Sequence, residues 1–527
     1  MESFLSWEYM PLVPPLLTLI LVIITRKVSI SLGAGIVTAA FVIAGGHFGE
    51  FFQILIDSFL AIFIEDGGLN TWNAFILIFL TLLGIMTAFM NMSGGAKAFT
   101  EWALTKVKTR RGAGLITGLL GVIIFIDDYF SSLIVGQVAK PITDKFKISR
   151  AKLAYLVDTT ASPVSIMVPI SSWGAGIMGM TAPLLVSAGL EHISPFQSFI
   201  YMVPMNFYVI AAMAIMLFVI IFKFDIGPMR KQEDLAINEG ILRDKVPDMA
   251  TEEDDLPVHE GSSAKALTVP IIGLAITVIA SMFISGGIAA GSWTLIDMLE
   301  NMMITHSLVI GGLVGLALAL VYYIGHTKND DNFGFKQVLL GIKTGFLAMF
   351  PAMLVLTFAW MIGGLITELG TGDVLGGMVE SSNLPVSLVP AVIFIVACIM
   401  AMATGTSWGS FGILIPIAGE IMISLNATDL LLPSIAAVLA GAVFGDHCSP
   451  ISDTTILSAT GSGADYIVHV MTQLPYAILS AVIGLVAFVV LGTTLSVGLA
   501  LLSLLACLIV VFIVVKFIYR PVSKETT

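Results

Sequence analysis

Residues 432–462 read LPSIAAVLAGAVFGDHCSPISDTTILSATGS, an apolar stretch of spanning length that is interrupted in its middle by Asp, His, Ser and Pro. A lipid-exposed helix does not tolerate such an interruption, because backbone groups freed at membrane depth need protein or water as partners. Residues 113–142, 150–182 and 386–425 are apolar stretches with similar Gly, Ser, Thr, Asp or Pro interruptions. These four stretches predict a membrane protein whose functional groups gather at helix breaks.

The composition supports this class. Of 527 residues, 57% are hydrophobic and 11% are charged, and the mean hydropathy is +0.99. A soluble globular protein carries about 25% charged residues. The apolar residues suffice for roughly a dozen crossings of about 20 residues each. The net charge of −12 excludes a general nucleic-acid-binding protein, which needs a basic surface.

Lys and Arg in short loops mark the cytoplasmic side of a membrane protein, and they cluster at 106–111 and 145–152. The apolar stretch 113–142 between these clusters must therefore enter the membrane and return, as a re-entrant hairpin. The stretch 386–425 is predicted to be a second hairpin, entering from outside. Broken crossings are predicted for 150–182 and 432–462, which join opposite sides. The uninterrupted crossings are predicted at 10–25, 28–46, 72–93, 198–222, 266–290, 303–324, 345–367, 474–492 and 496–516.

Segments without Lys or Arg should lie outside, and they are 1–9, 47–71, 183–197, 291–302, 368–385 and 426–431. The segment 51–64 has Asp57 at its centre, and we expect it to form a surface helix. The chain then has about eleven crossings and two hairpins, with its N-terminus outside and its C-terminus inside.

The two halves repeat the same order in opposite directions: three crossings, a hairpin, a broken crossing and a crossing. Aligning Ser162–Pro163 with Ser449–Pro450 also matches Ser165 with Ser452. Inverted repeats with interrupted helices are the architecture of secondary transporters. The predicted fold class is thus an all-α polytopic membrane protein with two inverted-topology repeats, each containing a re-entrant hairpin and a broken transmembrane helix.

The predicted organisation has four parts. The first transmembrane repeat covers 1–222, and the second covers 266–492. Between them, 223–265 is expected to be an acidic cytoplasmic linker, largely solvated because it is rich in charge. Residues 493–527 form an extra transmembrane helix and a cytoplasmic tail.

Candidate site residues lie at the hairpin tips and the breaks. A carboxylate within a span costs about 2.5–3.5 kcal/mol to insert, so Asp446 and Asp453, with His447 between them, indicate a function. Na⁺ is a hard cation that prefers oxygen ligands, and a buried carboxyl can hold either Na⁺ or a proton. We therefore predict Na⁺ binding by Asp446 and Asp453, with His447 as a pH-sensitive neighbour. The further candidate ion- or substrate-binding residues are Ser449, Ser452, Thr454, Asp127, Asp128, Ser131, Ser132, Thr159, Ser162, Gly405, Thr406 and Ser407.

Several of these acids allow other interpretations. Asp127 and Asp128 point to different faces of a helix, so one of them is expected to face the cavity. Asp128 could instead pair with Lys140 or cap the second arm of the hairpin. Asp158 could be a half-helix cap.

The hairpin tip Gly405–Gly409, GTSWG, also fits the G-x-S-x-G motif of serine hydrolases. With His447 and Asp446 it suggests an intramembrane serine hydrolase as a remote alternative. That motif draws its meaning from a strand–turn–helix context, which an all-helical membrane fold does not provide. We therefore expect no enzyme activity.

The stretch Phe444–Thr455, FGDHCSPISDTT, resembles the signature of the NhaC-type Na⁺/H⁺ antiporter family within the ion-transporter superfamily. Asp127-Asp128-Tyr129 followed by Ser162-Pro163 is similar to the same family, so the resemblance covers most of residues 70–490. It implies inverted repeats with hairpins and broken helices, and Na⁺/H⁺ exchange at a bacterial-type cytoplasmic membrane. The family also contains exchangers of small organic acids and suspected amino-acid carriers.

The expected function is secondary active exchange of Na⁺ for H⁺, with these ions as cargo, no cofactor and the lipid bilayer as surroundings. The alternative is Na⁺- or H⁺-coupled transport of a small organic acid or amino acid, because hydroxyl and N–H groups at the hairpin tips suit an anionic substrate. No G-x-x-x-x-G-K-[ST] motif occurs, so a gradient is expected to supply the energy. Homodimerisation is left open.

Overall fold

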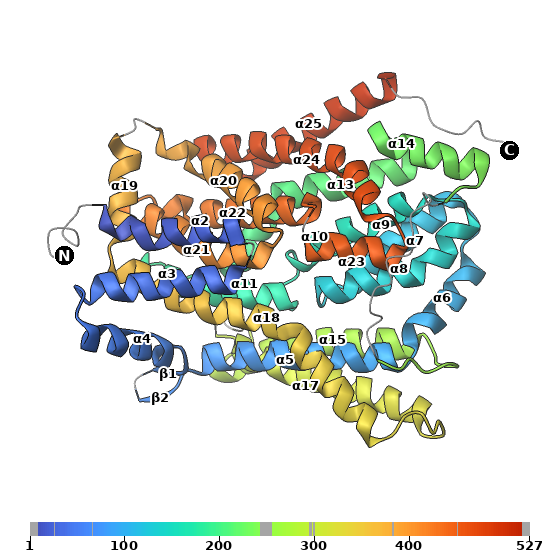
Figure 1. Cartoon of the computed structure of the whole chain (residues 1–527), viewed down its shortest axis with the longest axis horizontal. Helices are drawn as coiled ribbons and strands as arrows, with labels where there is room; N and C mark the ends of the chain where they lie inside the picture. The colour runs from blue at the N-terminus through green and yellow to red at the C-terminus, as the bar shows by residue number, and fades with distance from the viewer. Residues whose placement is uncertain are drawn as a thin grey trace.

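The computed structural model describes residues 9–25, 27–65, 67–242, 256–294, 298, 301–381, 384–450 and 452–518. Most of its helices run roughly along the long axis of the molecule, whereas α19 lies across it, as Figure 1 shows. In the described part, the strands are β1 (Ile64–Glu65) and β2 (Gly68–Leu69), which form one short antiparallel pair. The predicted all-α membrane fold is confirmed.

The first repeat begins with α2 (Val13–Thr25), which follows η1 (Met10–Leu12), and continues with α3 (Val28–Ile43) and α5 (Thr71–Met92). Its hairpin consists of α7 (Arg110–Ile123) and α8 (Asp128–Lys145). The broken crossing consists of α9 (Arg150–Thr160), α10 (Ser162–Ser165) and α11 (Ser172–Ser187). The last crossing is α13 (Phe207–Phe222), preceded by α12 (Pro195–Met202) and η2 (Val203–Met205).

The second repeat has the same order of elements. Its first crossings are α15 (Lys265–Ala290), α17 (Ile304–Thr327) and α18 (Phe335–Glu368). Its hairpin consists of α20 (Val389–Thr404) and α21 (Ser407–Ser424). Its broken crossing consists of α22 (Leu431–Cys448) and α23 (Asp453–Ser462), and its last crossing is α24 (Tyr466–Thr494). The extra helix α25 spans Val497–Ile518. The connecting helices are α4 (Phe48–Phe63), α6 (Gly95–Lys106), α14 (Gly227–Asp234), η3 (Leu235–Glu239), α19 (Thr371–Ser381), η4 (Val386–Leu388) and η5 (Thr428–Leu430).

Ten helices in the described part are long and apolar enough to cross a membrane. Within the apolar segment of the broken helix α22, 89% of the residues are buried inside the protein. The corresponding share for α25 is 17%. A helix that is apolar on all sides and exposed is stable in lipid rather than in water. The difference identifies α22 as the core of the bundle and α25 as a lipid-facing helix.

The two hairpins approach each other from opposite ends of the molecule. In Figure 1, α7 and α8 occupy the right half, and α20 and α21 occupy the left half. Hairpin two turns at Gly405, whose φ of +72° places it in the left-handed region that favours glycine. Both turns lie inside the molecule rather than at its ends, as predicted for re-entrant hairpins.

The two broken crossings are interrupted where serine and proline occur together. Helix α9 ends at Thr160, and the chain makes the short α10 before Ser171 caps α11 by accepting a hydrogen bond from the Gly174 N–H at 2.9 Å. Helix α22 ends at Cys448, and Ser452 caps α23. Proline has no N–H to continue a helix, so the two Ser-Pro pairs explain both breaks.

Close packing fixes the first hairpin against the second broken crossing. A Cβ atom at Gly136 in α8 would lie 2.6 Å from the carbonyl carbon of Gly461 in α23. No real side chain has such a contact, so these two helices approach at their backbones. This contact between the two repeats holds the tip of one beside the break of the other.

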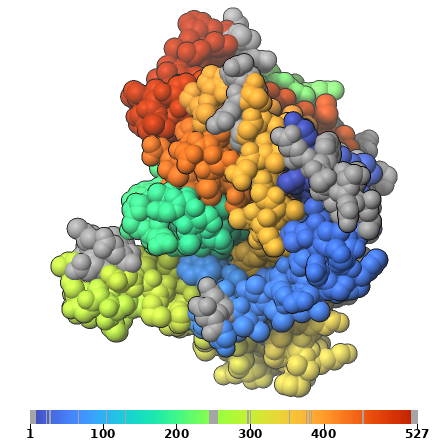
Figure 2. All heavy atoms as spheres, turned by 90° about the vertical axis from the view of Figure 1, so that its left-hand side faces the viewer, coloured from blue at the N-terminus to red at the C-terminus, as the bar shows by residue number. Residues whose placement is uncertain are grey.

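Segments without Lys or Arg gather at one end of the molecule. Figure 2 views that end, where α4, α19, the α11–α12 connection and the α21–α22 connection lie together. Helix α4 is the helix predicted for 51–64, and its exposed apolar side chains include Phe48, Phe52 and Phe59. The assignment of this end to the outside, and the division into four parts, stay predictions.

Two boundaries differ from the sequence analysis. The crossing predicted at 198–222 begins at Phe207, because Pro204 interrupts the helix and leaves η2 in its place. The linker at 223–265 is folded over its first part, where α14 packs on α9 and α24 and is followed by η3. Residues 243–255 of this linker lie outside the described residues.

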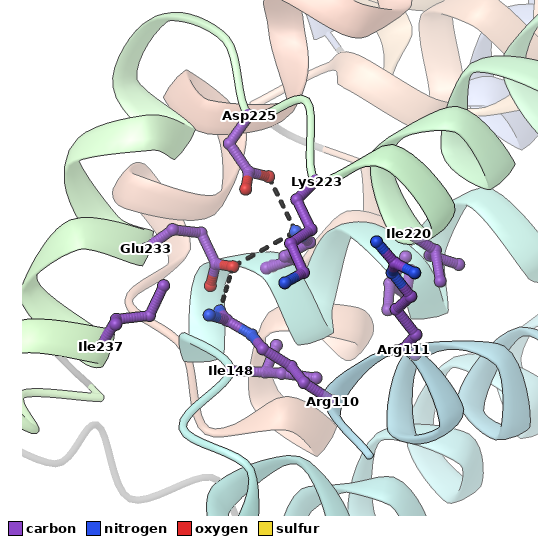
Figure 3. A pocket seen from close by; sticks show the side chains of 11 residues that line it. Arg110, Arg111, Ile148, Ile220, Lys223, Asp225, Glu233 and Ile237 are labelled. Atoms are coloured by element: carbon purple, nitrogen blue, oxygen red, sulfur yellow. Dashed lines mark hydrogen bonds and ion pairs between the residues drawn. The ribbon is translucent and has the colours of Figure 1, made fainter. Parts of the chain in front are cut away.

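An ion-pair cluster attaches this folded part of the linker to the first repeat. Lys152 in α9 contacts Asp225 at 2.8 Å and Glu233 at 3.2 Å, and Glu233 also pairs with Arg110 of α7. The Ser149 N–H donates to Glu233 Oε1 at 2.8 Å. Arg110, Lys152, Asp225 and Glu233 line an open pocket, shown in Figure 3. The first part of the linker is thus an integral part of this end of the bundle.

Candidate functional site

Five helix ends meet in the middle of the bundle: the starts of α8, α21 and α23, the end of α22, and the short α10. Helix ends leave backbone N–H and C=O groups without intrahelical partners. The sequence places hydroxyl and carboxyl side chains at each of these ends, and both repeats contribute. The tips and breaks therefore form one polar site inside an apolar protein.

Asp446, in the last turn of α22, is the centre of this site. Its Oδ1 accepts hydrogen bonds from Ser452 Oγ at 2.6 Å and from Thr454 Oγ1 at 3.1 Å. Its Oδ2 accepts from Ser407 Oγ at 3.0 Å and from Ser162 Oγ at 3.2 Å. Four hydroxyl groups from both repeats thus surround one carboxyl group that is 4% exposed.

Ser162 connects Asp446 to a second buried carboxyl group. Its Oγ lies 3.2 Å from Asp128 Oδ2, the same distance as to Asp446 Oδ2. The other oxygen of Asp128 accepts from Trp173 Nε1 at 3.0 Å. A serine hydroxyl has a single hydrogen to donate. Both short contacts are satisfied together when one carboxyl carries a proton, or when a cation binds beside the hydroxyl.

No basic side chain compensates these acids. Within the described residues, neither Asp128 nor Asp446 forms an ion pair. Asp128 is the first residue of α8, and its partners are Ser162 and Trp173 rather than Lys140. Buried carboxylates without a counter-ion are unfavourable, so the site favours the uptake of positive charge.

The first turn of α8 supplies further oxygen atoms. Ser131 and Ser132 are fully buried, and their hydroxyls have no hydrogen-bond partner in the described part of the chain. They lie three and four residues after Asp128, which places them on the same helix face. Asp127 lies just before the helix and accepts from Ser172 Oγ at 3.1 Å. Asp128, rather than Asp127, therefore faces the Asp446 carboxyl.

His447 is held away from the carboxyl pair. Its Nε2 lies 2.9 Å from Thr159 Oγ1, and its Nδ1 lies 2.6 Å from the hydroxyl of Tyr208 in α13. The structure therefore separates Thr159 and His447 from the hydroxyls around Asp446. Together they form a hydrogen-bonded contact between α9, α13 and α22.

The remaining predicted residues have mixed placements. Ser449 donates to the Met402 carbonyl at 2.8 Å and holds the break of α22 against α20. Asp453 begins α23, and its side chain lies outside the described residues. Gly405 and Thr406 form the turn that brings Ser407 to Asp446, and they act through their backbone.

A serine hydrolase requires a different arrangement. The Ser407 hydroxyl donates to Asp446, and both ring nitrogens of His447 have other partners. A hydrolase needs the histidine to bond the nucleophilic serine. These contacts argue against a Ser–His–Asp triad.

A second polar cluster beside this site was missed by the sequence analysis. Asp158 of α9 contacts Thr455 of α23, and His469 and Gln473 of α24. From the sequence, Asp158 is a possible half-helix cap, and His469 is not among the candidate residues. His469 is also fully buried. Its signal was the polar spacing of His469 and Gln473, four residues apart on one face of an apolar helix.

In the described part of the chain, no group of three or more His, Cys, Asp or Glu side chains is arranged to hold a metal ion. A cation at the Asp446 site would instead use carboxyl and hydroxyl oxygens, the ligand types that hard cations prefer. The donor set therefore fits an alkali cation as cargo rather than a resident transition metal.

Comparisons with known proteins agree with this architecture. Residues 164–493 match the model of the Na⁺/H⁺ antiporter family. An uncharacterised protein of Haemophilus influenzae is 39% identical over 95% of this chain and 94% of its own length. The malate-2H⁺/Na⁺-lactate antiporter of Bacillus subtilis is 33% identical over 34% of this chain and 36% of its own. The YdaH transporter of Alcanivorax borkumensis has a similar fold, with a TM-score of 0.55 at 13% identity over 85% of this chain and 90% of that structure.

Proposed function

Because the chain belongs to the Na⁺/H⁺ antiporter family, a family of secondary transporters, we propose that it exchanges Na⁺ for H⁺ across the membrane. The exchange takes place at the carboxyl pair Asp128–Asp446. Na⁺ and the proton are cargo that compete for this pair. The protein is a multi-pass membrane protein, and the bacterial cytoplasmic membrane is its proposed location.

The observation that supports this proposal is the position of Ser162, 3.2 Å from a carboxyl oxygen of both Asp128 and Asp446. One hydroxyl hydrogen cannot satisfy two carboxylates. A proton shared by the pair lowers its charge from −2 to −1, which makes burial less unfavourable. A Na⁺ ion bound between the same oxygens does the same, so each cargo replaces the other.

The oxygen atoms needed for Na⁺ are present around the pair. Ser407, Ser452 and Thr454 already point their hydroxyls at Asp446. Ser131 and Ser132 are buried beside Asp128, and their hydroxyls have no hydrogen-bond partner among the described residues. Asp453 stays a candidate ligand on its sequence position alone.

The second candidate is coupled transport of a small organic acid or amino acid. The relative from Bacillus subtilis exchanges malate and lactate by its name. In this chain, α21 begins at the hairpin tip without a side-chain cap, which leaves N–H groups that suit a carboxylate. Cation exchange is favoured because the carboxyl pair would repel an anion unless a cation were bound first.

The test is transport by the purified protein in proteoliposomes with a pH-sensitive dye inside. Under the proposal, a Na⁺ gradient imposed in either direction, without any organic substrate, moves protons in the direction opposite to Na⁺. Asp446→Asn abolishes this response, and Asp144→Asn, which alters a carboxylate paired with Arg150 at 2.6 Å, retains it. Proton movement that requires added malate, lactate or an amino acid would replace the first candidate with the second.

A further inference from the structure

A second buried acid lies beside the Asp446 site, between α9, α23 and α24. Asp158 has no exposed surface. Its Oδ2 accepts hydrogen bonds from Gln473 Nε2 at 2.7 Å and from Thr455 Oγ1 at 3.2 Å, and it lies 3.2 Å from His469 Nε2. All three partners meet at the same oxygen of the carboxyl group.

Among the described residues, one further polar atom on each of Asp158, His469 and Gln473 has no hydrogen-bond partner. Asp158 Oδ1, His469 Nδ1 and Gln473 Oε1 are all buried without a hydrogen bond in the described part of the chain. Native proteins leave few buried polar atoms unsatisfied, so three in one cluster point to a ligand. A proton, accompanied by a bridging water, fits a set that contains both acceptors and an imidazole nitrogen.

We propose that Asp158 and His469 form a second proton-binding site, separate from the carboxyl pair Asp128–Asp446. An ionised Asp158 beside a neutral His469 leaves a net negative charge in a fully buried place. One added proton, on the carboxyl or on the imidazole, makes the pair neutral overall, which burial favours. On release, the O–H or N–H bond breaks, its electron pair stays on the side chain, and the proton passes to water.

Two side chains connect this pair to the backbone at the break of α22. Thr455 Oγ1 lies 3.2 Å from Asp158 Oδ2 and 3.1 Å from the backbone carbonyl oxygen of Asp446, so its single hydrogen can be donated to either of them. Gln473 Nε2 bonds both Asp158 Oδ2 and the backbone carbonyl of His447. A change of charge at Asp158 therefore acts on the turn that carries Asp446. Such coupling is reciprocal, so Na⁺ at Asp446 weakens proton binding at Asp158.

Other titratable groups also influence this pair. Helix α22 contributes Asp446, His447 and Cys448, and α13 contributes Tyr208. Among these, Asp446 is the acid at which Na⁺ binds in the proposed exchange. Relative to the deprotonated carboxyl pair, Na⁺ bound at Asp446 adds one positive charge near Asp158 and so favours release of the second proton.

This inference rests on the proposed exchange for its coupling to Na⁺, and its proton site can be tested without Na⁺. The full-length protein is compared with Asp158→Asn and His469→Gln, and with Asp144→Asn as a carboxyl-to-amide control at the end of α8. Infrared difference spectra between two pH values, recorded without Na⁺, report titrating carboxyl and imidazole groups. A pH dye in weak buffer then counts the protons released when Na⁺ is added.

We expect Asp158→Asn and His469→Gln each to remove one titrating component from the infrared spectra, while Asp144→Asn retains it. Both variants still bind Na⁺, and they release fewer protons per Na⁺ than the wild type, by up to one. If Asp158→Asn does not fold, as judged by size-exclusion chromatography, His469→Gln provides the same comparison.

Spectra and proton counts equal to the wild type in both variants would overturn the second site. A wild type that releases no proton on Na⁺ addition, with the infrared component still lost in Asp158→Asn, would instead overturn the proposed exchange and leave the second acid in place. The two failures are thus distinguishable.

Discussion

Replacing Asp128 by Asn turns one carboxylate of the Asp128–Asp446 pair into a neutral amide and so removes one of the two negative charges. The Oδ2 atoms of Asp128 and Asp446 are each 3.2 Å from the Ser162 hydroxyl, so they are at most twice that distance apart. Two unit charges about 6 Å apart repel by roughly 2.8 kcal/mol at an effective dielectric constant of about 20. A Na⁺ ion that binds beside Ser162 relieves this repulsion in the wild type.

In Asp128→Asn this relief is lost, and about 2.8 kcal/mol corresponds to roughly a hundredfold in a binding constant. The dissociation constant for Na⁺, measured by isothermal titration calorimetry, should therefore rise by about that factor, and its dependence on pH should flatten. Asp144→Asn serves as the matched control because Asp144 pairs with Arg150 away from the site. Wild-type affinity and wild-type pH dependence in Asp128→Asn would refute the carboxyl pair as the cation site.

Three further predictions address the hydroxyls, the linker and pH. Ser407→Ala removes a hydrogen bond to Asp446, and a bond to a charged group is worth about 1.5–3 kcal/mol; calorimetry should show Na⁺ affinity about 10- to 100-fold weaker. Glu233→Gln breaks the buried cluster with Lys152 at a cost of about 3–5 kcal/mol; an unchanged thermal unfolding midpoint would contradict its role. A hydrogen bond from Lys97 lowers the pKa of Glu260, and the backbone N–H of Asn332 lowers that of Asp330, which also contacts His259 of the linker. The Lys97–Glu260 and His259–Asp330 contacts therefore stabilise linker docking above the ordinary carboxyl range, near about pH 4, and are lost below it; hydrogen-exchange protection over 256–264, corrected for the intrinsic exchange rate at each pH, should decrease in acid, and unchanged protection would exclude the effect.

The sequence predicts the architecture well because its strongest signals are local. Pro163 and Pro450 each follow a serine at a break, whereas Pro141 and Pro416 lie inside helices. Basic clusters predict which stretches return to the same side. The short break at Pro204 was missed, because the hydrophobic run around it conceals it. The folded first part of the linker was also missed, since the partners of Asp225 and Glu233 lie far away in the chain.

The sequence indicates candidate residues at the tips and breaks, and their binding role stays a prediction, but it does not indicate which of them are in contact. Both breaks and both tips were expected to be polar, yet sequence spacing cannot say that Ser162 of one repeat lies between Asp128 and Asp446. Pairings across repeats depend on backbone approaches such as that of Gly136 to Gly461. His469 was missed for a related reason, because a single histidine near the start of an apolar helix looks like an interfacial residue until Asp158 is placed beside it.

The competition between Na⁺ and the proton for one carboxyl pair can be measured at equilibrium, as the apparent dissociation constant for Na⁺ at a series of pH values. If a single shared proton must leave before Na⁺ binds, this constant rises by about tenfold for each unit of decreasing pH on the acidic side, and more steeply if the second proton leaves as well. The same series with Asp446→Asn shows no specific Na⁺ binding. A wild-type dissociation constant that stays the same at all pH values would contradict the proposed exchange.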